Sequence, residues 1–252
     1  MFLSLLKREV FRYIKNPLVT IGPPIVSQIL YVLVFGLVLG TRIGSVSGYS
    51  YISFMFPGLV MMALVTNSFM NPGWSLYQAR HFDWIEPILS SPMSSTQIVS
   101  AYILAGVIRG LLVSAILIVL ALVIPSVVVI SNPGFVILYL IIVSFLGSSL
   151  GTLIGLWADK FDHMALAQSF GLFPLVFLGG VFYSIEMVQG LTVLEVLVRI
   201  NPVTHMINGL RYGMIGVSEL PLSIGASGLI ALAFVLFLLN VRLFKIGYNL
   251  RV

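Results

Sequence analysis

The chain has 252 residues, of which 59% are hydrophobic and 8% are charged, with 13 basic residues against 8 acidic ones. Soluble domains carry about 25% charged residues, so this composition excludes a soluble globule, and runs such as "LLVSAILIVLALVI" lack the alternating polar positions of a transmembrane β-barrel. Apolar runs of about 20 residues, the span of a lipid hydrocarbon core, predict an all-α polytopic membrane protein, and the basic excess indicates cytoplasmic loops and contact with membrane lipids rather than with nucleic acid.

The first element expected is an amphipathic helix over residues 1–16. In "FLSLLKREVFRYIK", at about 100° per residue, the apolar side chains fall within an arc of about 120°, and Arg8, Arg12 and Lys15 lie on the opposite side. We expect this helix to lie along the membrane surface, either as a simple anchor or as an anchor that also contacts a cytoplasmic partner.

Six apolar runs follow, and we interpret them as six transmembrane helices over residues 18–40, 53–74, 98–124, 134–157, 164–184 and 222–243. Asn-Pro pairs that begin at Asn16, Asn132 and Asn201 stand where helices should start, because Asn caps a helix N-terminus and Pro fits its first turn. The pair Asn71-Pro72 is followed by Gly73, and it predicts a break in the second span and the start of a separate short helix.

That short helix belongs to the loop 75–97, which contains the charged and aromatic stretch "ARHFDWIEPILSSPMSS". If the N-terminus lies inside, the inner segments hold nine Lys and Arg residues and the outer segments hold three. The positive-inside rule then places both termini and this loop in the cytoplasm.

Residues 185–221 are too polar to span a membrane and too apolar to form a free loop. Two short helices that meet at Asn201-Pro202 would suit this segment. We expect them to lie at the outer face or to dip back into it.

Polar side chains within the spans are functional candidates, because charge in lipid is costly. Arg109 lies about ten residues into the third span, roughly 15 Å along its axis. We expect it to snorkel to the inner surface or to pair with a carboxylate such as that of Glu86, and direct contact with a substrate is the alternative. Weaker candidates, expected to serve helix–helix hydrogen bonding rather than transport, are Asn67, Gln28, Gln168 and Asn208.

The sequence offers no catalytic machinery. No stretch matches the phosphate-binding pattern GxxxxGK[ST], so we do not expect this chain to bind ATP in that way. His81, His163 and His205 are far apart, no HExxH motif occurs and the chain has no cysteine, so we expect neither a metal site nor catalytic residues. An intramembrane enzyme is therefore unsupported.

Several stretches are similar to one known family. The run "ARHFDWIEPILSSPMSSTQIVSAYILAGVIRGLL" resembles the cytoplasmic-loop signature of type-two ATP-binding-cassette (ABC) exporter permeases, in which a short charged helix precedes a turn and a span bearing Arg-Gly. "FPLVFLGGVFYSIEMV" and "INPVTHMINGLRYGMIG" resemble that family's fifth span and external segment, whose Asn-Pro and Arg pattern corresponds here to Asn201, Pro202 and Arg211. The resemblance covers nearly the whole chain and matches the family's six-span layout.

The resemblance implies a permease subunit of an ATP-driven exporter in a bacterial or archaeal cytoplasmic (inner) membrane. Two permease chains, expected to form a homodimer, would each dock a separate ABC ATPase subunit that binds ATP and Mg, while this chain holds no cofactor and is not an enzyme. The N-terminal helix would be the connecting helix, and the short helix in the 75–97 loop would be the coupling helix.

The resemblance also implies which residues dock the ATPase. Phe82, Trp84 and Ile85 would form a buried anchor, while the residues that would face or brace the partner are Arg80, His81, Asp83 and Glu86. Pro87 departs from the family pattern, which often has a second acidic residue there, and it suits a helix start.

An ATP-independent channel or a secondary carrier is the alternative from a different class. A carrier should have carboxylates for its coupling ion within the spans, whereas all eight acidic residues lie outside the spans or at their ends. Co-purification of an ATPase would separate the two hypotheses.

Overall fold

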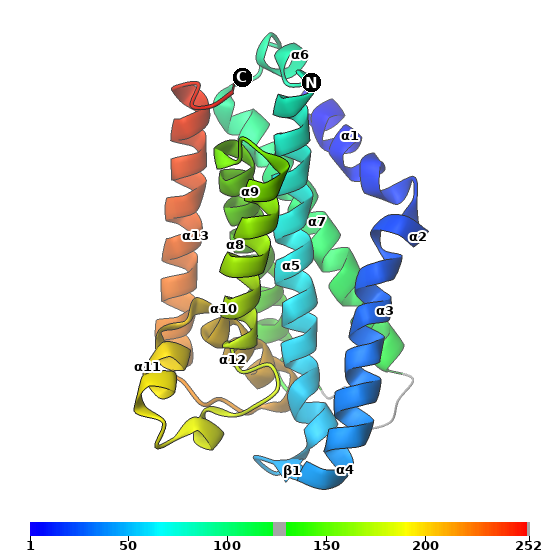
Figure 1. The fold of residues 1–252 in the computed structure, drawn as a ribbon, viewed down its shortest axis with the longest axis vertical. Coiled ribbons are helices and arrows are strands. Elements are labelled where there is room, and N and C mark those ends of the chain that lie inside the picture. Colours follow the sequence, from blue (N-terminus) through cyan, green and yellow to red (C-terminus); the bar gives the residue numbers. More distant parts are fainter. Residues whose placement is uncertain (123–129, 251–252) are drawn as a thin grey trace.

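The computed structural model describes residues 1–122 and 130–250, and most of these are helical (Figure 1). One end of the molecule carries both chain termini, and we call it the terminal end; the other carries the hairpin of β1 (Ser45–Val46) and β2 (Tyr49–Ser50), and we call it the hairpin end. α1 (Phe2–Ile14) lies obliquely at the terminal end, and α2 (Pro17–Thr20) leads from it into the first long helix.

Among the described residues, five helices are long and apolar enough to cross a membrane. The first, Gly22–Ile43, joins α3 (Gly22–Tyr31), a π-helical stretch (Val32–Leu39) and α4 (Gly40–Ile43); the others are α5 (Tyr51–His81), α7 (Ser95–Ala121), α8 (Pro133–Trp157) and α13 (Leu222–Lys245). Residues 123–124 of the predicted third span lie outside the described residues. The chain is therefore an all-α polytopic membrane protein.

The segment predicted as the fifth span, residues 164–184, is shorter and more broken than expected. α9 (Phe161–Leu166), a π-helical stretch (Ala167–Leu172) and α10 (Phe173–Phe177) form one continuous helix, which ends in turns around Gly180 at φ +79°. This helix is short of the about 20 residues that a span usually needs, so the sixth crossing stays a prediction. The chain then passes through a 3₁₀ turn (Ile185–Val188), α11 (Thr192–Ile200) and α12 (Pro202–Ile215), and α13 returns to the terminal end (Figure 1).

α5 is continuous through Pro57 and Pro72, so the predicted break at Asn71-Pro72 is wrong. α5 is buried within the bundle here, where an unwound turn would leave backbone N–H and C=O groups without partners, at several kcal/mol each, whereas a proline inside a helix removes a single N–H donor. Residues 75–81 consequently belong to α5 rather than to a loop. The connection from α5 to α7 is shorter than predicted and contains only α6 (Glu86–Leu89).

α8 packs directly against α5 along a line of glycines. Gly147, Gly151 and Gly155 recur every four residues and so share one face of α8. A Cβ at Gly155 would lie 2.6 Å from the Gly73 carbonyl oxygen, and one at Gly151 would overlap the Phe69 carbonyl oxygen. Small residues that let two backbones approach are a usual basis of helix association in membranes, and here they place α5 at the centre of the bundle.

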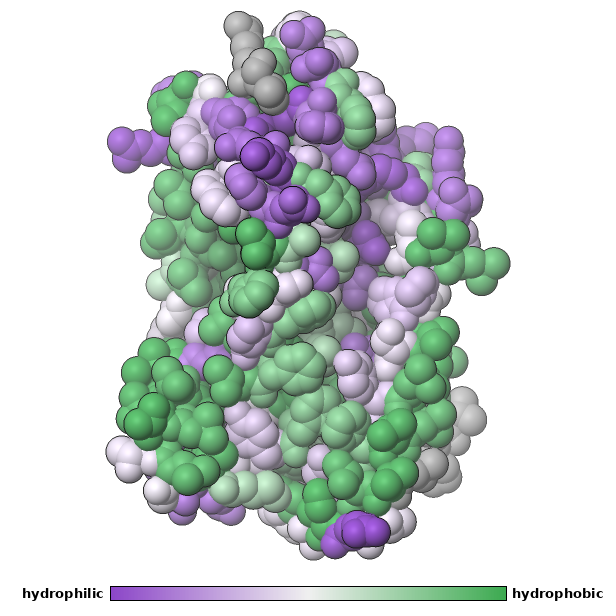
Figure 2. Space-filling model, in the orientation of Figure 1, coloured by the Kyte–Doolittle hydropathy of each residue, from purple (hydrophilic) through white to green (hydrophobic). Residues whose placement is uncertain are grey.

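Hydrophilic residues gather at the terminal end, and the middle and lower parts of the visible face are largely apolar, as expected for a membrane-embedded chain (Figure 2). A hollow separates α3 from α5 on this face (Figure 2). The two features adjoin, because the hollow opens toward the polar terminal end.

Candidate functional site

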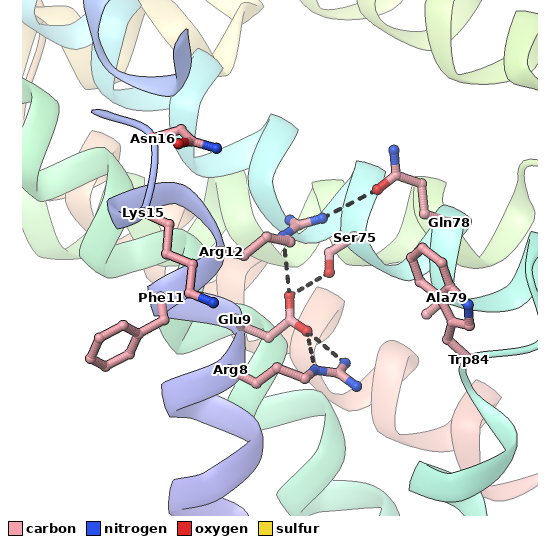
Figure 3. A pocket seen from close by; sticks show the side chains of 10 residues that line it. All are labelled: Arg8, Glu9, Phe11, Arg12, Lys15, Asn16, Ser75, Gln78, Ala79 and Trp84. Atoms are coloured by element: carbon pink, nitrogen blue, oxygen red, sulfur yellow. Dashed lines mark hydrogen bonds and ion pairs between the residues drawn. The ribbon is translucent and has the colours of Figure 1, made fainter. Parts of the chain in front are cut away.

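A groove of about 600 Å³ opens at the terminal end between α1 and the last turns of α5. We call it the terminal groove, and the ten residues that line it are labelled in Figure 3. The sequence of α1 accounts for it: Leu5 and Tyr13 pack into the interior against α5 and α7, which leaves Arg8, Arg12 and Lys15 along the groove wall.

Glu9 is a buried acidic residue of this groove, and its charge is compensated within the chain. Its Oε1 accepts a hydrogen bond from Arg8 Nη2 at 2.7 Å, and its Oε2 accepts a short hydrogen bond from the Ser75 hydroxyl (Figure 3). Arg12 Nε lies 3.8 Å from the same Oε2, and Arg12 Nη1 donates to Gln78 Oε1 at 3.4 Å. These interactions hold α1 against α5, and they leave the groove with an excess of positive charge.

The turn after α5 carries the residues predicted to dock an ATPase. α5 ends at His81, and α6 begins only at Glu86, so residues 80–86 form a helix end and a tight turn rather than one short helix. Asp83 adopts φ +58°, a left-handed conformation that Asp tolerates better than most residues. The Ile85 N–H donates to the Ala79 carbonyl at 2.8 Å, which closes the turn.

Two aromatic side chains project from this turn into solvent. Phe82 is 53% exposed and Trp84 is 60% exposed, and their ring centroids are 5.2 Å apart. His81, Asp83 and Glu86 are exposed beside them. Large exposed aromatics in a polar surround are typical of interaction sites.

Ile85 does not belong to this exposed anchor, contrary to the prediction. Its side chain is buried in an apolar cluster with Leu76 of α5 and Ile98 of α7. Ile85 therefore packs the turn against α5 and α7 of the same chain. The exposed members of the predicted anchor are therefore Phe82 and Trp84.

Arg80 also points inward, and its guanidinium is unavailable to a partner. Its side chain is 2% exposed, and its Nη1 donates to the carbonyl oxygens of Gly155, Leu156 and Ala158 at 2.7 to 3.1 Å. Its Nη2 lies 3.5 Å from Asp159 Oδ1. The last carbonyls of a helix lack partners within the helix and carry partial negative charge, so Arg80 closes the C-terminal end of α8 and fastens it to α5.

Three of the five polar candidates lie together. Arg109, Gln28 and Asn67 line one cavity between α3, α5 and α10, whereas Gln168 lies in the π-helical stretch 167–172 and does not line it. Gln28 and Asn67 are buried. Asn67 Nδ2 donates to the carbonyl of Ala63 at 2.9 Å, so this amide is used within its own helix.

Arg109 does not form the predicted pair with a carboxylate. Its Nη2 donates to the Thr20 carbonyl at 2.8 Å, and its guanidinium lies 5.8 Å from the centre of the Tyr13 ring. No ion pair within residues 1–122 and 130–250 includes Arg109. It lies about 21 Å along α7 from Ser95, a depth at which an unpaired charge is costly.

The Asn-Pro motif begins α12. Asn201 Oδ1 accepts a hydrogen bond from the Val203 N–H at 2.9 Å, as an N-cap does, and Pro202 occupies the first turn. Asn201 Nδ2 donates to the Leu175 carbonyl at 2.7 Å. The motif thus sets the start of α12 and ties it to α10.

The remaining residues of the motif stabilise the same region. Arg211 is buried; its Nη1 lies 3.2 Å from Glu219 Oε2, its Nη2 donates to the Gly180 carbonyl at 2.8 Å, and its guanidinium lies 3.8 Å from the centre of the Phe54 ring. Burial raises the pKa of the Glu219 carboxyl, and the charge of Arg211 opposes that rise. Asn208 Oδ1 accepts from the Glu219 N–H at 2.7 Å and so positions the acid. These contacts connect α12 to α5, which is a structural role.

Two features of the structure were not expected from the sequence, the buried Glu9 and the line of glycines. Glu9 is the only acidic residue before Asp83 and lies in a basic helix, which is a signal for an internal ion pair. The spacing of Gly147, Gly151 and Gly155 is a signal for close helix packing. In the part of the chain that the structure describes, no three His, Cys, Asp or Glu side chains gather as a metal site would require.

Comparisons with known proteins agree with this architecture. The family model described as ABC-2 type transporter matches residues 1–215. The inner membrane transport permease YadH of Escherichia coli strain K12 is 34% identical over 252 residues, a match that covers 98% of this chain and 96% of YadH. The same permease from Escherichia coli O157:H7 and from Shigella flexneri matches with equal identity and coverage. The similarity therefore includes both the terminal groove and the spans.

Proposed function

Because the chain belongs to the ABC-2 type transporter family and is an integral transport permease of the inner membrane, we propose that it is the membrane subunit of an ATP-driven exporter. It forms the translocation path and couples to a separate ATPase subunit, which binds ATP and Mg. The observation that carries this proposal is the exposed pair Phe82 and Trp84 beside the terminal groove.

This surface suits a soluble protein partner. Trp and Arg are enriched among the residues that dominate binding energy at interfaces, and Trp84 lines the groove together with Arg8 and Arg12. The alternative for Trp84 is a place among lipid headgroups, where Trp is common. We favour the protein partner, because the exposed acids Asp83 and Glu86 flank Trp84 in the sequence and would be repelled by anionic lipids.

The terminal end is then the cytoplasmic side, with both termini inside. The Lys and Arg residues of the inner segments comprise Lys7, Arg8, Arg12, Lys15, Arg80, Lys160, Arg242 and Lys245, with Arg251 outside the described residues, whereas the outer segments hold Arg42, Arg199 and Arg211. Cysteines introduced at Ser47 and Ser218 should react with an impermeant thiol reagent in intact cells, and one at Ser95 only after permeabilisation. Labelling at Ser95 in sealed cells would reverse the orientation. The chain has no native cysteine that would interfere.

The permease is proposed to act as a homodimer that lipids surround. In the first span, Gly22–Ile43, only 12% of the most apolar window is buried within the chain, against 89% in α5. A helix that packs so little against its own chain has its remaining surface available for a second copy or for lipid.

Site-specific cross-linking tests the proposed function. Asp83→Cys places a thiol in the exposed turn, and Ser47→Cys places one at the hairpin end as a matched control. The permease is expressed with a candidate ABC ATPase subunit, and a cross-linker that joins a thiol to an amine is added. We expect a permease–ATPase product with Asp83→Cys and none with Ser47→Cys. If no ATPase co-purifies or cross-links, an ATP-independent channel or carrier replaces the exporter.

A further inference from the structure

The terminal groove continues into the membrane as one furrow between the first span and α5. A second cavity of about 320 Å³ shares Arg12 and Gln78 with the groove, and a third of about 440 Å³ shares Thr20, Met70 and Arg109 with the second. Figure 2 shows the corresponding hollow on the same face. We call the second and third cavities together the lateral furrow.

The polar half of the lateral furrow is positively charged. Arg12 and Arg109 line it, and no Asp or Glu is among the described residues that line either cavity. The nearest acid, Glu9, already has both oxygens engaged by Arg8, Arg12 and Ser75. The charge of Arg109 therefore has no counter-ion in the described chain, although an unpaired cation at this depth is unfavourable.

Hydrogen-bond donors in the same place lack acceptors. Arg109 Nε and Asn71 Nδ2 are buried and have no hydrogen-bond partner among the described residues. Asn71 is 1% exposed, and its Oδ1 lies 3.4 Å from Arg12 Nη2. Buried donors without partners are destabilising, so an anionic acceptor bound here would relieve both the charge and the missing hydrogen bonds.

Away from Arg109 the third cavity is mostly apolar, although Thr66 and Asn67 also line it. Phe173, Phe177 and Met62 line it beside Gln28, and Gln28 also lines a further cavity of about 220 Å³ whose other nine lining residues are all apolar. Gln28 lies in α3, six residues or about 9 Å along the helix axis from Gly22, so the apolar part begins further from the terminal end than Thr20, whose carbonyl binds Arg109. This succession of cation, donors and apolar wall matches a molecule with an anionic head and a hydrocarbon tail.

We propose that the lateral furrow binds an anionic amphiphile, with its head at Arg109 and Arg12 and its tail among α3, α5 and α10. The idea that this amphiphile is the transported substrate rests on the proposed function as an exporter subunit. The binding itself does not, because all the groups involved belong to this chain. The site is open toward the terminal end, so such a molecule enters from the side that also carries Trp84.

Binding is measured on the purified full-length permease in neutral maltoside detergent, without any ATPase. Trp74 lines the lateral furrow, and Trp84→Phe with Trp157→Phe leaves it as the single fluorescent reporter. Dodecyl phosphate is titrated as the probe, with inorganic phosphate as the head alone and dodecyltrimethylammonium as the matched cation. We expect a saturable change with dodecyl phosphate at a concentration at least about tenfold below that of either comparison probe.

Substitutions then locate the head. Arg109→Gln should weaken dodecyl phosphate binding about tenfold or more, whereas Arg109→Lys keeps the charge and should retain most of it. Arg242→Gln removes an exposed cation of α13 that does not line the furrow, and it should change nothing.

Three results would overturn the proposal. Equal binding of inorganic phosphate would indicate a site for a soluble anion, and equal binding of the cationic amphiphile would indicate mere partition. An equal fluorescence change from a variant that keeps only Trp157, which lies outside the furrow, would also indicate non-specific partition of the amphiphile. If Arg109→Gln does not fold, the probe comparison and Arg109→Lys still decide. Because no ATPase is present, a failure to bind dodecyl phosphate leaves the exporter proposal standing. Failure of the ATPase cross-linking experiment likewise leaves the binding proposal standing.

Discussion

Truncation of Trp84 should release the ATPase subunit and leave the permease folded. A Trp side chain covers about 150–250 Å², and Trp84 is 60% exposed, so a partner can cover roughly 90–150 Å² more of it. At about 25 cal/mol per Å², this area contributes roughly 2–4 kcal/mol. We therefore expect Trp84→Ala to weaken ATPase association by at least about 30-fold, which corresponds to about 2 kcal/mol.

The assay measures the dissociation constant of the ATPase subunit for the permease in lipid nanodiscs, together with thermal unfolding of the permease alone. Phe234→Ala is the matched control, because Phe234 is also 60% exposed but lies on α13, away from the turn. Ile85→Ala provides the contrast. Ile85 is buried within the chain, so its truncation should cost about 2–5 kcal/mol of stability.

A Trp84→Ala permease that binds the ATPase within twofold of the unmodified permease would refute the reasoning and assign Trp84 to the lipid headgroups. A loss of binding matched by a large loss of thermal stability would also refute it, because Trp84 would then be a packing residue. Only weaker binding with unchanged unfolding fits an exposed anchor.

Three further predictions concern the same end of the molecule and its core. Arg80→Ala should lower the free energy of unfolding by about 3 kcal/mol or more, because three carbonyls lose a charged donor; Arg80→Lys should recover part of this, and an unchanged melting temperature would exclude the role. Gly151→Ala should abolish a monodisperse gel-filtration peak, whereas Gly228→Ala, with nothing within 4 Å, should preserve it. A hydrogen bond from Asn249, followed by the charge of Arg80, holds the pKa of Asp159 below its ordinary value. The stability that this carboxylate contributes is therefore present above its pKa in the unfolded chain and is lost as the pH falls through its pKa in the folded chain. Asp159→Asn should flatten the dependence of the melting temperature on pH below about pH 4.

The sequence predicts the membrane class and most helices well, because long apolar runs and Asn-Pro starts are local signals. Asn201 caps α12 as its type and position suggest. At Asn71-Pro72 the local signal for a break is equally clear, yet α5 continues. There the tertiary packing decides, because Gly73 lies directly against Gly155 of α8 and an unwound backbone buried at that contact would have no water to satisfy it.

The candidate site is harder to predict, because the sequence does not show whether each side chain packs into the protein interior or is exposed at the surface. Arg80 and Trp84 lie four residues apart in one polar stretch, and Arg80 is buried while Trp84 is exposed. What separates them is the end of α8, whose free carbonyls attract Arg80 and lie about 75 residues further along the chain. No pattern within the stretch itself contains that information.

The line of glycines and the hydrogen bonds from Arg80 to the end of α8 also determine how this permease can move. Backbones in direct contact cannot slide past one another without losing that contact, so α5 and α8 form a single rigid body. The two π-helical stretches, Val32–Leu39 and Ala167–Leu172, both lie outside it, one in the first span and one in the helix 161–177. Such stretches often mark functional positions in helices. We therefore expect a fixed central column with a hinge on either side, so that the first span and the helix 161–177 swing while α5 and α8 stay still.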